Sequence, residues 1–243
     1  MHGEATGRRT PLCFAQAKAA TEAVLARFLT ATFTSTLPMP TNTSYDQRAT
    51  IHPTPVLATG PLRIQFDGRL LFHGLMVQIV PGLNAITGDE QTGKTTLLRA
   101  LCNKAPPDQT TPIATPAFGL LFEPPHPGDP TPDDLWRAAQ ARCPHWSEQA
   151  CSDLIDRLAF APHRHKTLSM MSTGTRRKVE TIAVLASGAA VMCLDQPYAS
   201  LDMPSIDALR DHFRTIGQHT DQALVIADYE PDPRLHWQQV IAL

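Results

Sequence analysis

The spacing of hydrophobic residues along the chain predicts where the folded domain begins. Residues 1–61 are rich in Thr, Ser and Pro and carry only a weak helical pattern near the start, which is typical of an extension and linker. From residue 62 onward the pattern becomes regular. Hydrophobic side chains recur at every second position over residues 75–79, and an apolar run fills residues 83–87, as expected of strands. We therefore expect a Thr/Pro-rich extension without regular structure over residues 1–61 and one domain over residues 62–243.

The second half of the chain alternates helical and strand patterns. Prolines crowd residues 106–132, which excludes a regular helix over most of that interval. Helices are predicted at about 132–142, 148–160 with Ser147 as N-cap, 176–185 and from Pro204 onward, and strands at 117–122, 190–194 and 223–227. Strands that are apolar throughout and alternate with helices predict an α/β fold with a mostly parallel sheet covered on both faces.

Composition and charge narrow the function classes. A formal net charge of −2 gives no basic stripe for a phosphate backbone, so we expect no nucleic-acid partner. The five cysteines include no C-x-x-C pair, which argues against a disulfide framework or a zinc site and favours the cytoplasm. The longest apolar stretch, Ile182–Leu194, is interrupted by Ser187 and Gly188 and is shorter than the roughly 20 residues of a membrane helix. A membrane role therefore requires a partner.

A phosphate-binding motif lies between a predicted strand and a predicted helix. Residues 88–96 match G-x-x-x-x-G-K-[ST] with Gly88, Gly93, Lys94 and Thr95, and Thr96 follows. The glycines allow backbone N–H groups to face phosphate oxygens, the lysine reaches the β- and γ-phosphates, and Thr95 is expected to bind Mg²⁺. A glycine-rich turn with an ordinary surface lysine is the alternative, and the strand and helix on either side disfavour it. The motif predicts nucleotide binding.

Three later segments resemble the ATP-binding cassette (ABC) family. Met171–Val179 is similar to the family's signature, with Ser172 and Gly174 in place. An apolar strand ending at Asp195 follows at the family's spacing and resembles the Walker B motif. Residues 200–202 resemble the D-loop. Taken alone, the signature segment would be an ordinary helix N-cap followed by a solvated basic face; the order and spacing of the motifs favour the family.

The resemblance implies a fold, ligands and partners. It implies a P-loop NTPase of ABC type with an antiparallel N-terminal part and a reduced helical subdomain at about 131–172. ATP and Mg²⁺ would bind to the phosphate loop and Asp195, with Phe66 stacking on adenine, although a core role for that ring is equally open. Ser172 and Gly174 would face the nucleotide of a second cassette in a homo- or heterodimer. A membrane permease subunit would hold the protein at the inner face of the membrane.

Three positions depart from the family pattern. Gln196 replaces the glutamate that polarises the attacking water, and an amide cannot accept a proton. Asp228 stands where the family has a histidine that contacts the γ-phosphate, and Glu123 stands where it has a magnesium-binding glutamine. Glutamate still suits a hard cation, and Asp228 is equally well explained as a plain loop carboxylate. We expect an ABC-type ATPase that hydrolyses ATP slowly.

Two other functions compete with the ATP-powered subunit of a transporter. One is a regulatory or structural switch that ATP clamps without transport, which Gln196 and Asp228 favour. The other is a small-molecule kinase with the same phosphate loop, which the signature, the Walker B strand and the D-loop disfavour.

Overall fold

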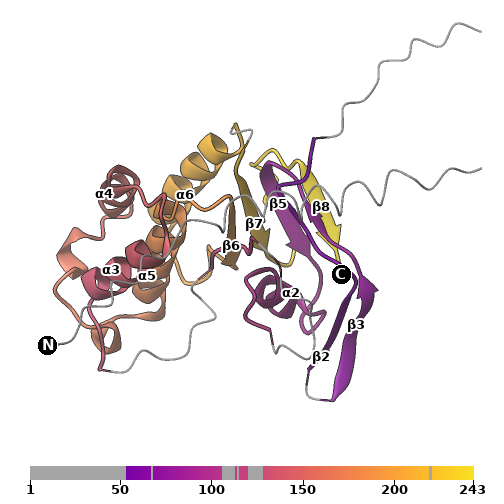
Figure 1. Ribbon diagram of the computed structural model, residues 1–243. Coiled ribbons are helices and arrows are strands. Elements are labelled where there is room, and N and C mark those ends of the chain that lie inside the picture. The colour runs from indigo at the N-terminus through magenta and orange to yellow at the C-terminus, as the bar shows by residue number, and fades with distance from the viewer. Residues whose placement is uncertain (1–52, 67, 106–112, 114, 120–127, 219–220) are drawn as a thin grey trace, which may run out of the picture. The chain divides into compact units, whose positions relative to one another are not determined.

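The computed structural model describes residues 53–66, 68–105, 113, 115–119, 128–218 and 221–243 (Figure 1). Glu123 and nearly all of the predicted extension and linker lie outside these residues. In chain order the elements are β1 (Leu57–Ala58), β2 (Leu62–Phe66), β3 (Arg69–Leu75), β4 (Gln78–Ile79), β5 (Gly82–Thr87), α2 (Lys94–Leu101), α3 (Pro132–Arg142), α4 (Glu148–Arg157), the 3-10 turns η1 (Ala161–His163) and η2 (Leu168–Met170), α5 (Thr173–Ala186), β6 (Val191–Asp195), α6 (Met203–Ile216), β7 (Ala223–Ala227) and β8 (Gln239–Ala242).

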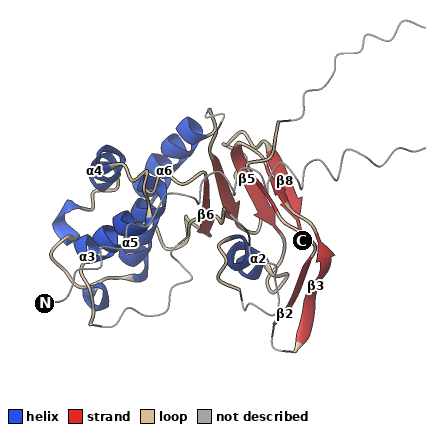
Figure 2. Cartoon of the chain, viewed as in Figure 1, coloured by secondary structure: helices blue, strands red, loops and turns tan. Residues whose placement is uncertain are grey.

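A parallel sheet forms the centre of the domain, as the apolar strands predicted. Its order is β6-β7-β5-β8, and each neighbouring pair is parallel. Phe118 adds a parallel bridge to Met192 at the β6 edge, within the strand predicted at 117–122. β8 was not predicted, because its four residues include a polar glutamine and none is fully buried. The arrangement of strands and helices in Figure 2 confirms the α/β fold.

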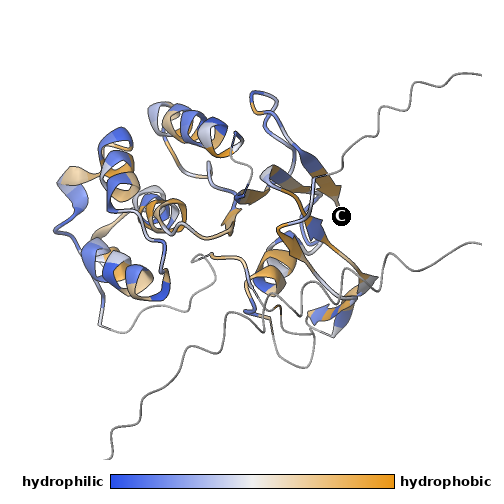
Figure 3. Ribbon diagram, turned by 45° about the horizontal axis from the view of Figure 1, so that its top comes forward, coloured by the Kyte–Doolittle hydropathy of each residue, from blue (hydrophilic) through white to orange (hydrophobic). Residues whose placement is uncertain are grey.

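Hydrophobic cores cover both faces of the sheet. On β6, Met192 and Leu194 pack with α3, α4, α5 and α6, whereas Val191 and Cys193 pack with α2 and strands β1 to β4. Alternate residues of one strand thus enter opposite cores, which is why the strand is apolar at every position. The strands of the sheet carry mainly hydrophobic residues with a few hydrophilic ones in Figure 3, while the helices carry both hydrophilic and hydrophobic residues.

The N-terminal part of the domain is antiparallel. β2 pairs with β3, and β1 pairs with β4 through Leu57 opposite Ile79. The structure thus places β1 within the range expected to be linker. The alternating segment at residues 75–79 is divided between the end of β3 and β4 rather than forming one strand.

Side-chain caps set the helix starts. Thr131 and Asp134 form a capping box at α3, and the Ser147 hydroxyl accepts a hydrogen bond from the Ala150 amide at 3.1 Å, as predicted for α4. α4 ends at Arg157, earlier than expected, and Ala159 has a positive φ of 50°. Over the described residues, every helix is too short or too polar to cross a bilayer.

Candidate nucleotide-binding site

The phosphate loop joins the buried strand β5 to α2, and two glycines shape it. Gly88 and Gly93 have φ of 148° and 103°, a region that side chains disfavour. A Cβ on Gly93 would lie 2.7 Å from the Phe72 ring, and one on Gly88 would lie 2.8 Å from the Thr92 hydroxyl. The turn therefore requires glycine at both positions, and its backbone amides and the N-terminus of α2 lie around one space.

Lys94 lies inside this loop. Its side-chain Nζ donates hydrogen bonds to the carbonyl oxygens of Gly88 and Asp89, both at 2.6 Å, and the residue is only 7% exposed. The Nζ also lies 5.0 Å from the centre of the Tyr229 ring. The loop thus holds an ammonium group where the motif predicts contacts to phosphate.

Thr95 at the start of α2 contacts Asp195 at the end of β6. The Thr95 hydroxyl donates to Oδ2 of Asp195 at 2.6 Å, which brings the first turn of α2 to the end of β6. A hydroxyl and a carboxylate are ligands that suit Mg²⁺. The predicted metal-binding pair is therefore assembled, whereas Glu123 lies outside the described residues.

A pocket of about 800 Å³ surrounds these groups, a size typical of small-molecule sites. Phe66, 58% exposed at the end of β2, lines it together with Gly93, Lys94, Thr95 and Thr96. Gly88 contributes through its carbonyl bond to Lys94. The pocket is also lined by Arg69, Arg99 and Tyr229, which were not predicted because none of them belongs to the phosphate-loop motif.

Gln196 lies at the edge of the pocket in a constrained backbone conformation. Its φ is 45°, and its amide donates to the Ala227 carbonyl at 2.8 Å. Arg177 of α5 donates from Nη1 to the carbonyl oxygens of Asp195 at 2.9 Å and Gln196 at 2.6 Å. Arg177 was expected only as part of a basic run, so this contact was missed.

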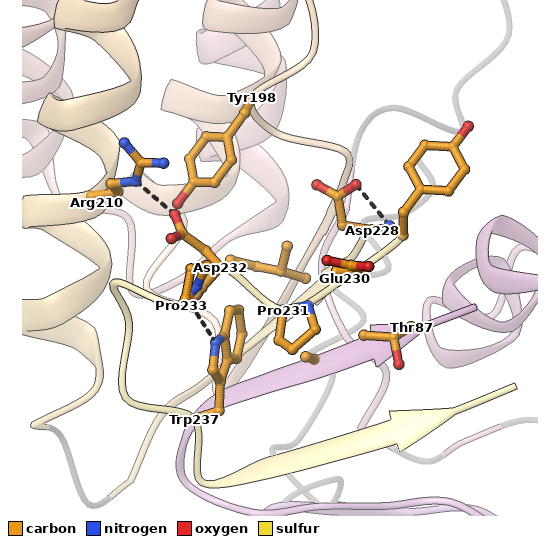
Figure 4. A pocket seen from close by; sticks show the side chains of 12 residues that line it. Thr87, Tyr198, Arg210, Asp228, Glu230, Pro231, Asp232, Pro233 and Trp237 are labelled. Carbon is orange, nitrogen blue, oxygen red and sulfur yellow. Dashed lines mark hydrogen bonds and ion pairs between the residues drawn. The ribbon is translucent and has the colours of Figure 1, made fainter. Parts of the chain in front are cut away.

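Asp228 follows β7 and does not line the pocket around Lys94. Its Oδ1 accepts a hydrogen bond from the Tyr229 amide at 2.8 Å, and the residue lines a second pocket of about 360 Å³ with Tyr198, Arg210 and Asp232 (Figure 4), which Tyr229 also lines. Burial raises the pKa of the Asp228 carboxyl, and nearby Asp195 reinforces this effect, whereas the Tyr229 amide, Lys94 and Arg177 oppose it. Tyr229, and not Asp228, lines the pocket around Lys94.

The signature segment forms the start of α5. The Ser172 hydroxyl accepts from the Thr175 amide at 3.2 Å, so this serine is the helix N-cap. A Cβ on Gly174 would lie 2.1 Å from the Ser200 carbonyl oxygen, which shows that α5 packs directly on the D-loop. Neither Ser172 nor Gly174 lines the pocket around Lys94 of the same chain.

Known proteins share the sequence and the fold. A profile of the ABC transporter family matches residues 73–199. The cytochrome c biogenesis ATP-binding export protein CcmA of Aromatoleum aromaticum is 29% identical over 189 residues, covering 68% of this chain and 84% of the relative. The zinc import ATP-binding protein ZnuC of Halorhodospira halophila is 25% identical over 183 residues, covering 72% and 68%.

Solved structures agree on the fold. A putative ABC transporter ATP-binding protein from Pyrococcus furiosus has a TM-score of 0.59 at 18% identity, covering 77% of this chain and 96% of that one. A putative metal-chelate type ABC transporter in an inward-facing conformation has a TM-score of 0.55 at 18% identity, covering 73% and 74%. With the family profile spanning more than half of its length, this chain belongs to the ABC transporter family.

Proposed function

We propose that this chain is the ATP-binding subunit of an ABC-type transporter. It binds MgATP at an interface with a second cassette and couples binding or slow hydrolysis to a membrane permease subunit. The observation that carries the proposal is the arrangement of Lys94 inside the phosphate loop beside the hydrogen-bonded pair Thr95 and Asp195.

The pocket suits ATP at both ends. The loop amides, the N-terminus of α2 and Lys94 favour the negative charge of the phosphates. The exposed ring of Phe66 at the same pocket offers a flat face to adenine. Thr95 and Asp195 would hold Mg²⁺ through oxygen atoms, and the ion would offset phosphate charge.

Slow hydrolysis follows from Gln196. Its side chain is an amide, so it can orient water but cannot accept a proton. Loss of a general base typically lowers the rate by about 10²- to 10⁴-fold. Asp228 does not replace the missing general base in this arrangement, because its carboxylate accepts a hydrogen bond from the Tyr229 amide and the residue lines the second pocket.

A second cassette would complete the site. Ser172 and Gly174 at the N-terminus of α5 form a natural anion site, and because they do not line the pocket of their own chain they are available to a partner's nucleotide. Since Gln196 weakens the chain's own site while the signature is retained, a non-identical partner cassette suits a cycling pump, and a homodimer suits a long-lived clamp. We place the protein in the cytoplasm, held at the inner face of the membrane by the permease.

An ATP-gated regulatory or structural switch without transport is the second candidate, and Gln196 is the observation that favours it. Single-turnover hydrolysis by the purified chain separates the two: measurable conversion of bound ATP to ADP supports a motor, and a stable ATP complex supports a switch. Membership of the ABC transporter family argues against the small-molecule kinase.

Titration of the chain with a fluorescent ATP analogue and Mg²⁺ tests the proposed site. Lys94→Ala is expected to abolish binding, because the ammonium group that meets the phosphates is removed. Lys166→Ala, in the helical region and outside the pocket lining, is the matched control and should bind like the parent. Unchanged affinity in Lys94→Ala would refute the site.

A further inference from the structure

Tyr229 connects the end of β7 to the phosphate loop. Its hydroxyl donates to Oε1 of Glu90 at 2.9 Å, and its ring lies over the Nζ of Lys94, 5.0 Å from the ring centre. The three residues line the same pocket. Tyr229 thus contacts two side chains of the phosphate loop, the carboxylate of Glu90 and the ammonium group of Lys94.

The backbone of Tyr229 is held at both ends of the residue. Its amide donates to Oδ1 of Asp228 at 2.8 Å, and its carbonyl accepts from the Gly88 amide at 3.4 Å. These contacts fix the start of the phosphate loop to the strand end and direct the ring toward the pocket. Asp228 therefore acts as a positioning residue for Tyr229.

The acceptor that Tyr229 uses has the charge and hydrogen-bonding character of a phosphate oxygen. The carboxylate of Glu90 lines the same pocket as Lys94, and it accepts a hydrogen bond from the phenol hydroxyl as a phosphate oxygen would. A nucleotide in the loop brings more negative charge to Lys94 than one carboxylate does, and like charges a few ångströms apart repel. A phosphate bound at Lys94 would therefore repel the Glu90 carboxylate and compete with it for the hydroxyl of Tyr229.

We propose that Tyr229 is the side chain with which this chain contacts the terminal phosphate of ATP, and that the phosphate replaces Glu90 as the acceptor of its hydroxyl. The phenol supplies the neutral donor that Asp228 cannot supply. Glu90 provides a hydrogen-bond acceptor for the Tyr229 hydroxyl within the chain itself. It therefore competes with any nucleotide and lowers the affinity of the loop for it. The inference rests on the proposed binding of MgATP at this loop.

The test compares the dissociation constants of MgATP and MgADP for the full chain. Tyr229→Phe keeps the ring over Lys94 and removes the hydroxyl, so the preference for ATP over ADP should fall roughly tenfold, as for a lost charge-assisted hydrogen bond. Tyr198→Phe is the matched control: it removes the hydroxyl of a tyrosine that does not line the pocket around Lys94, and the preference should stay at the parental value.

Glu90→Gln tests the second half of the proposal. Removal of the carboxylate charge should tighten the binding of ATP and ADP alike, severalfold each. Tyr229→Phe placed on the Glu90→Gln background should still reduce the preference for ATP. Thermal unfolding of each variant shows whether it is folded, and the half-exposed position of Tyr229, 48% exposed, makes the phenylalanine variant structurally mild.

The outcomes separate the inference from the function on which it rests. If the parent binds ATP and loses it with Lys94→Ala, but a folded Tyr229→Phe keeps the parental preference for ATP over ADP, the inference is overturned and the proposed function stands. If the parent binds neither nucleotide, both are overturned. The inference is also overturned if Tyr229→Phe weakens the binding of ADP and of ATP by the same factor, because the contact is then not with the terminal phosphate.

Discussion

The Thr95 hydroxyl donates a 2.6 Å hydrogen bond to the carboxylate of Asp195. This bond joins the start of α2 to the end of β6 and identifies both residues as one candidate Mg²⁺ site. Asp195→Asn keeps the size of the side chain and removes its charge. We expect Mg²⁺ to strengthen ATP binding much less in this variant than in the parent, measured by titration with Mg²⁺ and with EDTA. Asp153→Asn, on the exposed face of α4, is the control. An equal effect of Mg²⁺ in the parent and Asp195→Asn would contradict the assignment.

Restoring a general base at position 196 should increase turnover. Gln196→Glu introduces a carboxylate at the pocket edge, and we expect single-turnover hydrolysis to rise at least about tenfold, toward the range typical of a general base. The double variant Lys94→Ala, Gln196→Glu measures any contaminating ATPase. Should the rate stay at the parental value, the missing base is not what limits hydrolysis.

Gly174 is required for the contact between α5 and the D-loop. A Cβ there would lie 2.1 Å from the Ser200 carbonyl oxygen, so Gly174→Ala must displace one backbone segment. Such overpacking typically costs about 1–3 kcal/mol, which denaturant unfolding would detect. Gly60→Ala, where a Cβ meets nothing within 4 Å, is the control. Equal stability of the two variants would show that α5 and the D-loop separate easily.

Glu180 on α5 should make stability depend on pH. Burial raises the pKa of its carboxyl to about 7, against the opposing effect of Arg177 and Arg176. The folded state then binds more protons than the unfolded state, so this contribution is fully present below about 4.5 and is lost as pH rises toward 7. Glu180→Gln should therefore gain stability relative to the parent over that window, by up to about 1.4 kcal/mol per pH unit.

Urea unfolding at several pH values between these limits measures the difference between Glu180→Gln and the parent. Glu148→Gln, at the start of α4, is the matched control. A difference between Glu180→Gln and the parent that is constant across the window would show that the carboxyl is not perturbed in the folded state.

Local signals predicted much of this structure because they act within a few residues. The Ser147 cap, the apolar run of β7 and the glycines of the phosphate loop each depend on near neighbours or on burial of a whole strand. The family's motif order also predicted that Thr95 and Asp195 would meet. The antiparallel pairing of β1 was missed, because two residues in a proline-rich segment carry no periodicity.

The contacts that distinguish this site were beyond sequence reasoning. Tyr229 and Glu90 are far apart in the chain, and their hydrogen bond exists only because β7 lies beside β5. The sequence placed Asp228 at the family's phosphate-sensing position, whereas the backbone turns that carboxylate toward another pocket. Which of two adjacent side chains faces the pocket is decided by backbone direction after the strand, which composition does not encode.

Arg177 gives the cassette a mechanical property. One guanidinium group from α5 donates to the carbonyl oxygens of both Asp195 and Gln196. The same helix packs closely on Ser200 at Gly174. A tilt of α5 would therefore pull on the backbone at Gln196 without an intervening hinge. In the proposed dimer, α5 of one subunit would contact the nucleotide bound to the other subunit. A movement of α5 on that contact would shift Gln196 of its own subunit, so that nucleotide binding at one site would affect water orientation at the other.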